Sequence, residues 1–128
     1  MDGRTLSQYA GMLDPRDDRW NLRLLLHEFG LVWQDATAGE RRQLIGDAPP
    51  PTGSRRWDAF LGAYAEHLAY HAGQPAPSWA TSPDRYLHTV WFPLTDDIAT
   101  LRVEALVHAP AHFDAHGVFI ARRELEVV

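Results

Sequence analysis

The sequence RRWDAFLGAYAEHLAYHAGQPAPSWATSPDRYLHTVWFP, residues 55–93, decides the fold of this chain. It holds three of the five tryptophans and three of the four tyrosines. Its first part repeats apolar residues at helical spacing, which predicts a long helix that Ser54 caps and Gly73 ends. A Pro-rich loop follows, then a short helical turn at 82–84 and an extended aromatic segment at 88–93.

Capping residues predict further helices on both sides of this stretch. Asp14 and Pro15 are typical of a helix start. The helix that follows would bury a wide face with one row of Trp20, Leu24 and Leu31 and a second row of Leu22, Leu25, Phe29 and Val32. The other predicted helical segments are 5–12, 38–45 after the Thr37/Glu40 capping box, 95–108 after Thr95, and a short turn from Pro110 to Gly117. The three prolines of 46–53 predict a stiff, non-helical connector.

These elements predict an all-α fold, a compact multi-helix single domain over residues 1–128 with one extended aromatic segment. A chain of 128 residues with 45% apolar composition can build one hydrophobic core without cross-links. Within this domain, residues 1–13 are expected as a loosely attached N-terminal helix.

Composition limits the classes of function. The chain has no cysteine, so disulfides, thiol nucleophiles and thiolate metal sites are excluded. It shows no apolar run of membrane-spanning length and no signal-peptide pattern at its start, which predicts a cytoplasmic protein. All twelve basic residues are arginine, which suggests a GC-rich bacterial genome. The net charge of −5 disfavours direct contact with nucleic acid.

Histidines offer the best candidates for chemistry. His67 and His71 lie four residues apart on the long helix and could share a metal ion, and His112 with His116 could supply a second pair. The segment EHLAYH is not HExxH, and its Glu66 lies off the face that the two histidines share. Solvent-facing histidines are the alternative interpretation and the one we favour.

Other catalytic patterns are weaker. Each serine near a histidine sits in a cap or beside a proline, the paired aspartates lie in first helical turns, and no Gly-rich phosphate loop occurs. The sequence therefore favours a protein that is not an enzyme and implies no cofactor.

The aromatic residues after the Pro-rich loop have two interpretations. They fit a helical core, because aromatic side chains bury large areas. They also have the composition of an interaction hot spot, in which aromatic and arginine side chains dominate. The candidate partner-binding residues are Trp79, Arg85, Tyr86, Trp91 and Phe92.

The elements APPPTGSRRWDAFL, PAPSW, SPDRYLHTVWFP and APAHFDAHGVFI, in this order, resemble an uncharacterised bacterial domain family. The match runs from about Trp20 to the C-terminus. Members are similar to the C-terminal region of helix-turn-helix regulators, or are encoded beside nucleotidyltransferase-like toxins. The chain leaves no room for a helix-turn-helix domain before Trp20, and its last element carries histidine and aspartate where the family has arginine. DNA binding is therefore not carried over.

The resemblance implies a non-catalytic protein-interaction module, antitoxin-like or regulatory. Its partner would be a protein, and the candidate that the resemblance suggests is a toxin encoded by an adjacent gene. The alternative is a small metal-dependent enzyme that uses His67, His71, His112 and His116.

Overall fold

The computed structural model describes residues 3–93 and 105–125, and it confirms the all-α prediction. Over these residues the chain is built from short helices around one long helix, with a single isolated β-bridge. The elements are α1 (Leu6–Ala10), α2 (Asp18–Leu22), the π-helical η1 (Arg23–Phe29), α3 (Gly30–Asp35), α4 (Ala38–Gly46), α5 (Arg55–His71), the 3-10 turns η2 (Ser78–Thr81) and η3 (Pro83–Arg85), α7 (Ala111–Ala115) and η4 (Arg122–Leu125). None of the helices in the described part is long and apolar enough to cross a membrane.

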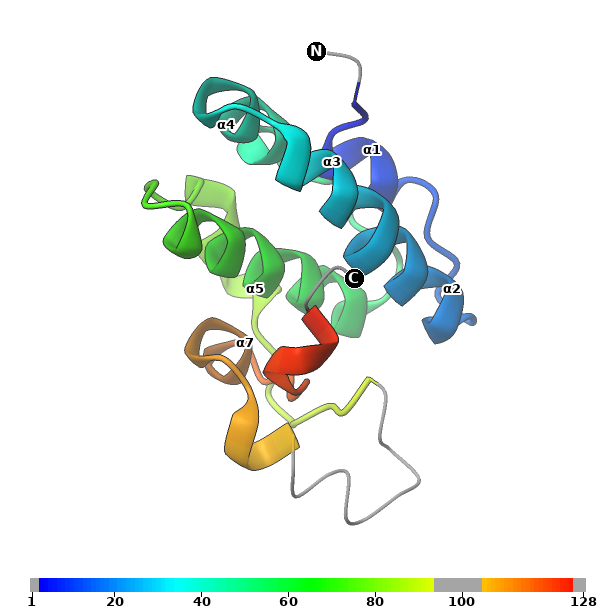
Figure 1. The fold of residues 1–128 in the computed structure, drawn as a ribbon. Helices are drawn as coiled ribbons and strands as arrows, with labels where there is room; N and C mark the ends of the chain where they lie inside the picture. The colour runs from blue at the N-terminus through cyan, green and yellow to red at the C-terminus, as the bar shows by residue number, and fades with distance from the viewer. Residues whose placement is uncertain (1–2, 94–104, 126–128) are drawn as a thin grey trace.

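Helix α5 is the centre of the molecule. Figure 1 shows it between the N-terminal helices on one side and α7 with the C-terminal segment on the other. Nine of its seventeen residues are buried, so it is covered on more than one face. Ser54 caps its first turn, as the sequence predicts, and its aromatic side chains Trp57, Phe60 and Tyr64 are almost fully enclosed.

Helices α2, η1 and α3 follow one another without a break, and the middle seven residues are π-helical. A π-helix bonds each amide to a carbonyl five residues back, so it turns more slowly than an α-helix. The carbonyl of Leu25 in this segment accepts a buried hydrogen bond of 2.9 Å from the Tyr64 hydroxyl on α5. Burial raises the pKa of Tyr64, which keeps that hydroxyl a donor.

Two predictions about this helix are wrong. Asp17, not Asp14, accepts the capping bond, and the buried Asn21 side chain instead holds the backbone amide and carbonyl of Asp14. Trp20 and Leu31 are each 43% exposed rather than on the buried face. The predicted face assumes α-helical periodicity throughout, and the π-helical segment breaks that register.

The N-terminal helix α1 is an integral part of the core and not loosely attached. Leu6 is completely buried, and the ring of Tyr9 meets Phe29 edge-on at 5.7 Å. The predicted capping box of α4 is also confirmed, with Thr37 and Glu40 each accepting the other's backbone amide.

The predicted aromatic segment is packed at Trp91 and Phe92 only, because 88–90 are exposed and the chain bends at 88–89. Trp91 forms the β-bridge with Val118, and its ring meets Trp57 edge-on at 5.0 Å. Its amide donates to Gly117 and its carbonyl accepts from Phe119, at 2.9 and 2.8 Å. Most of the helix predicted after Thr95 lies outside the described residues; its last part, 105–108, is helical.

Gly62 allows α5 to approach η2 and η3. A Cβ atom at this position would lie 2.7 Å from the Arg85 Cβ and 2.9 Å from the Ala80 carbonyl oxygen. A backbone oxygen cannot move aside as a flexible side chain can. The close contact between these elements therefore requires glycine.

Replacing Gly62 with alanine should lower the free energy of unfolding by about 1–2 kcal/mol, because overpacking outweighs the helix propensity that alanine adds. Gly39→Ala on α4 is the matched control, since nothing lies within 4 Å of its added Cβ. That variant should be neutral or more stable, by up to about 1 kcal/mol. Urea denaturation measures both, and equal effects at the two sites would contradict this packing.

Removing the Tyr64 hydroxyl should destabilise the protein by about 1–2 kcal/mol, because the buried Leu25 carbonyl loses a donor. Tyr70→Phe is the control: it removes the same hydroxyl from the same helix, but at a side chain that is 67% exposed. The control should stay within about 0.5 kcal/mol of the parent protein in urea denaturation. A Tyr64→Phe protein as stable as the control would show that the bond contributes nothing.

Candidate functional site

Five titratable side chains gather where α7 packs on α5, and we call them the His-Glu cluster. Three come from α5 and two from α7 and the residue after it: Glu66, His67, His71, His112 and His116. The sequence prediction contains the four histidines but places Glu66 apart from them. In the structure Glu66 is the residue that joins the two helices.

His116 is the most enclosed member of the cluster, with no exposed surface. Its Nδ1 lies 2.5 Å from the carbonyl oxygen of Arg85, and its Nε2 is hydrogen-bonded to Glu66 Oε1. The ring of Tyr86 stacks on it, with centroids 4.1 Å apart and planes 9° from parallel. Gly117 follows with a φ of +84°, which ends α7 and turns the chain toward Trp91.

The outer part of the cluster is partly open to solvent. His112 Nδ1 lies 3.3 Å from Glu66 Oε2, and its side chain is 32% exposed. Tyr70 lies beside it, with ring centroids 5.3 Å apart. Glu66 therefore faces one histidine in the interior and one at the rim.

His67 is held as a neutral ring. Burial, followed by the neighbouring His71, His112 and Arg122, lowers the pKa of His67 to about 4. Its Nδ1 is buried without a hydrogen-bond partner, and its ring packs 4.4 Å from His71 and 5.5 Å from Phe113. These contacts are those of a core side chain.

The four histidines lie near one another but do not converge on a point. Within 3–93 and 105–125, no group of three or more histidine, aspartate or glutamate side chains has an arrangement that could hold a metal ion. His116 has both ring nitrogens engaged, so it has no lone pair to offer as a ligand. The metal-site alternative therefore gains no support from this geometry.

The five predicted partner-binding residues divide into two groups. Arg85, Trp91 and Phe92 are buried, with exposed fractions of 4%, 2% and 9%, while Trp79 and Tyr86 are partly exposed. An anchor must be exposed before its partner binds, so the three buried residues do not form a preformed docking surface.

Arg85 serves the interior of this chain instead. Its guanidinium donates to the carbonyl of Pro49 at 2.7 Å and to that of Asp58 at 3.4 Å, and it lies over the Trp79 ring. Because prolines supply no amide donors, the Pro-rich connector needs such a side chain to pair its buried carbonyls. The Trp79 indole donates to the carbonyl of Ile45 at the end of α4.

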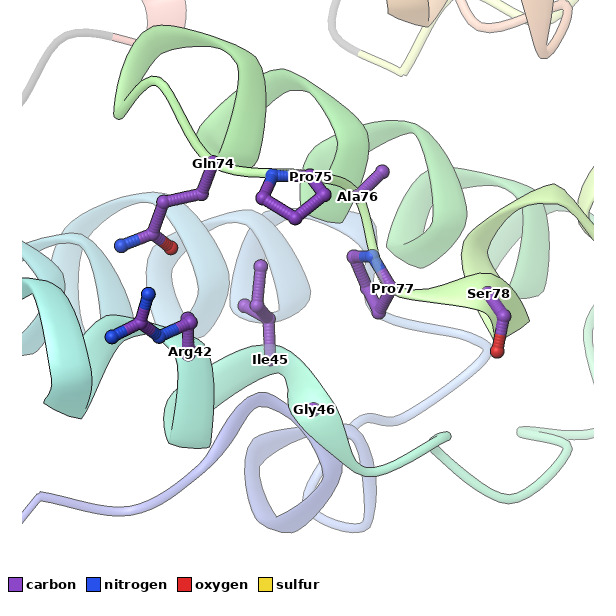
Figure 2. A pocket seen from close by; sticks show the side chains of 8 residues that line it. All are labelled: Arg42, Ile45, Gly46, Gln74, Pro75, Ala76, Pro77 and Ser78. Carbon is purple, nitrogen blue, oxygen red and sulfur yellow. The ribbon is translucent and has the colours of Figure 1, made fainter.

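A separate pocket of about 290 Å³ lies between the end of α4 and the loop after α5. Figure 2 shows Ile45 of α4 opposite Pro75 and Pro77 of the loop, with Arg42 and Gln74 at one side. Gln74 donates from its side-chain amide to Ala38, and its Oε1 is buried without a partner. The residues that line the pocket include no acid, base or nucleophile pair with which to carry out a reaction.

Comparison with protein-family models, with curated proteins and with solved structures finds no match for this chain. The family resemblance of the sequence thus stays a prediction.

His67 should make the fold sensitive to acid. Its pKa is lower in the folded protein than the ordinary 6.5, so the unfolded chain binds the proton more readily. The stability it contributes is complete above about pH 6.5 and is lost as the pH falls toward 4. Since the ring is partly exposed, we expect a loss of only about 1–2 kcal/mol.

His67→Phe should remove most of this loss, because phenylalanine fills the same space without a titrating group. The measurement is the free energy of unfolding from pH 7 to pH 4.5. His88→Phe is the control, since His88 is exposed. An acid loss that His67→Phe leaves unchanged would mean that another group causes it.

Proposed function

We propose that this chain is a non-catalytic protein-interaction module of an antitoxin-like or regulatory kind. The observation that carries the proposal is a contrast between its polar and apolar side chains. Glu66, Arg85 and His116 are engaged in internal hydrogen bonds, whereas large apolar side chains stand exposed on the C-terminal half. These are Tyr70, Val90, Leu106 and Val107, each at least half exposed.

Three of these apolar residues lie on neighbouring segments. Phe92 and Ala105 belong to one small buried cluster with Phe119, so the chain near Val90 and the chain at 106–107 run close to each other. Exposed aliphatic side chains on neighbouring segments are typical of protein contact surfaces. We name Val90, Leu106 and Val107 the apolar patch.

The net charge of the chain favours a protein partner over nucleic acid. The net charge is −5, and the cation Arg85 is used inside the fold. Nucleic-acid affinity depends on exposed basic side chains that neutralise phosphates. By the family resemblance, the first candidate is a nucleotidyltransferase-like toxin encoded by an adjacent gene.

The test is co-expression with the products of the adjacent genes, followed by size-exclusion chromatography with light scattering. The proposal predicts a stable hetero-complex whose mass fits both chains. Metal analysis of the same peak separates it from the enzyme alternative. A lone species that carries one equivalent of a transition metal would contradict the proposal.

Within such a complex, Val90→Asp should weaken binding at least about tenfold, because it puts a charge at an apolar contact. Leu31→Asp is the matched control, since Leu31 is an exposed aliphatic residue on α3, in the N-terminal half. Calorimetry or surface plasmon resonance compares the two variants, with circular dichroism to confirm that both remain folded. Equal affinities would exclude the apolar patch as the docking surface.

A further inference from the structure

The two ring nitrogens of His116 both face oxygen atoms. Nδ1 points at the carbonyl of Arg85, which can only accept a hydrogen bond, so Nδ1 must carry a proton. Nε2 then has no proton in a neutral ring, yet it is bonded to the carboxyl group of Glu66. That second bond needs one more proton.

The extra proton has two possible positions. It lies on Nε2, which gives an imidazolium beside a carboxylate, or on Glu66, which gives a carboxylic acid that donates to a neutral ring. In both forms the pair holds one proton more than a neutral histidine and an ionised glutamate. Without it, a lone pair of the buried ring faces an oxygen, and one of the two bonds is lost.

We propose that Glu66 and His116 jointly retain one proton that locks the C-terminal part of the molecule onto α5, so that this docking weakens as the pH rises. In the unfolded chain an imidazole loses its proton above about pH 6.5. The folded state then binds more protons than the unfolded state, and stability must fall with increasing pH. This inference goes beyond the proposed function and does not depend on it.

The neighbouring groups leave this proton in place. On α5, His67 is neutral and His71 contacts it; on α7, His112 faces the other oxygen of Glu66. The phenol of Tyr86 covers the His116 ring, and its pKa is raised by burial and by Glu66. From the remaining elements, Arg122 of η4 helps to lower the pKa of His67. The Arg85 guanidinium donates to the carbonyls of Pro49 and Asp58.

The hydrogen bond between His116 and Glu66 holds several segments together. The carbonyl of His116 accepts from the Leu87 amide at 3.0 Å, and the next carbonyl, of Gly117, accepts from Trp91. A Cβ at Gly117 would lie 3.0 Å from that of Leu87, so the two segments are in close contact. Losing the bond from His116 to Glu66 would therefore loosen the whole aromatic segment from α5.

Glu66→Gln tests the proposal directly. A glutamine can donate its amide to His116 Nε2 and accept from His112 Nδ1, so every bond is satisfied without the extra proton. Between pH 7 and 9, the unfolding equilibrium constant should rise more steeply with pH for the parent protein than for Glu66→Gln. The difference should be a factor of up to about ten per pH unit. His112→Gln is the matched control, because it changes the other partner of Glu66 and should keep the parent's pH dependence. Equal pH dependence of the parent and Glu66→Gln would overturn the proposal.

Hydrogen exchange on the unaltered protein gives an independent test, even if the variant does not fold. The protection factors of the Leu87, Trp91 and Phe119 amides should fall between pH 7 and 9, relative to amides within α4. Unchanged relative protection over this range would also overturn the proposal.

Discussion

The structure depends on the burial of α5. Nine of its residues are inaccessible to solvent, and they include the rings of Trp57, Phe60 and Tyr64. A helix enclosed on several faces needs cover from elements that are distant in sequence, so both the N-terminal helices and the C-terminal segment pack on it (Figure 1). Aromatic rings on α5 each bury a large apolar area and so contribute strongly to the stability of this core.

This burial also determines what the polar residues do. Each polar group that enters the interface with α5 needs a partner there, because water is excluded. Tyr64 bonds the carbonyl of Leu25 in the π-helical segment, Arg85 bonds those of Pro49 and Asp58, and His116 joins Glu66 to the carbonyl of Arg85. Arg85 and His116, which the sequence suggests as binding or metal-ligating residues, thus connect elements of the fold by hydrogen bonds.

Local signals in the sequence predict much of the fold. The caps Ser54 and Thr37, the proline-rich connector and the turn at 82–84 each act within a few residues, and the structure has all of them. The helical spacing of 18–35 predicts the burial of Leu22, Leu24, Leu25 and Phe29, and the structure confirms it. The exposure of Trp20 and Leu31 could not be predicted, because a π-helical segment changes the periodicity without a distinctive residue pattern.

Only part of the candidate site could be predicted from the sequence. Helical spacing pairs His67 with His71, but the contact of Glu66 with His116 spans fifty residues and depends on how α7 lies on α5. Likewise, hot-spot composition cannot separate an exposed anchor from a core residue. Arg85 is a core residue because its guanidinium donates to the carbonyl of Pro49, a contact 36 residues away that composition does not indicate.

His116 connects α5 to the C-terminal part of the molecule and is not available as a reactive group. Mass spectrometry after brief treatment of the native protein with diethyl pyrocarbonate tests it, because this reagent modifies accessible, unprotonated imidazoles. The account predicts modification of the exposed His71 and His88, while the buried His116 stays unmodified until the protein unfolds. Modification of His116 in the native protein as fast as that of His88 would contradict it.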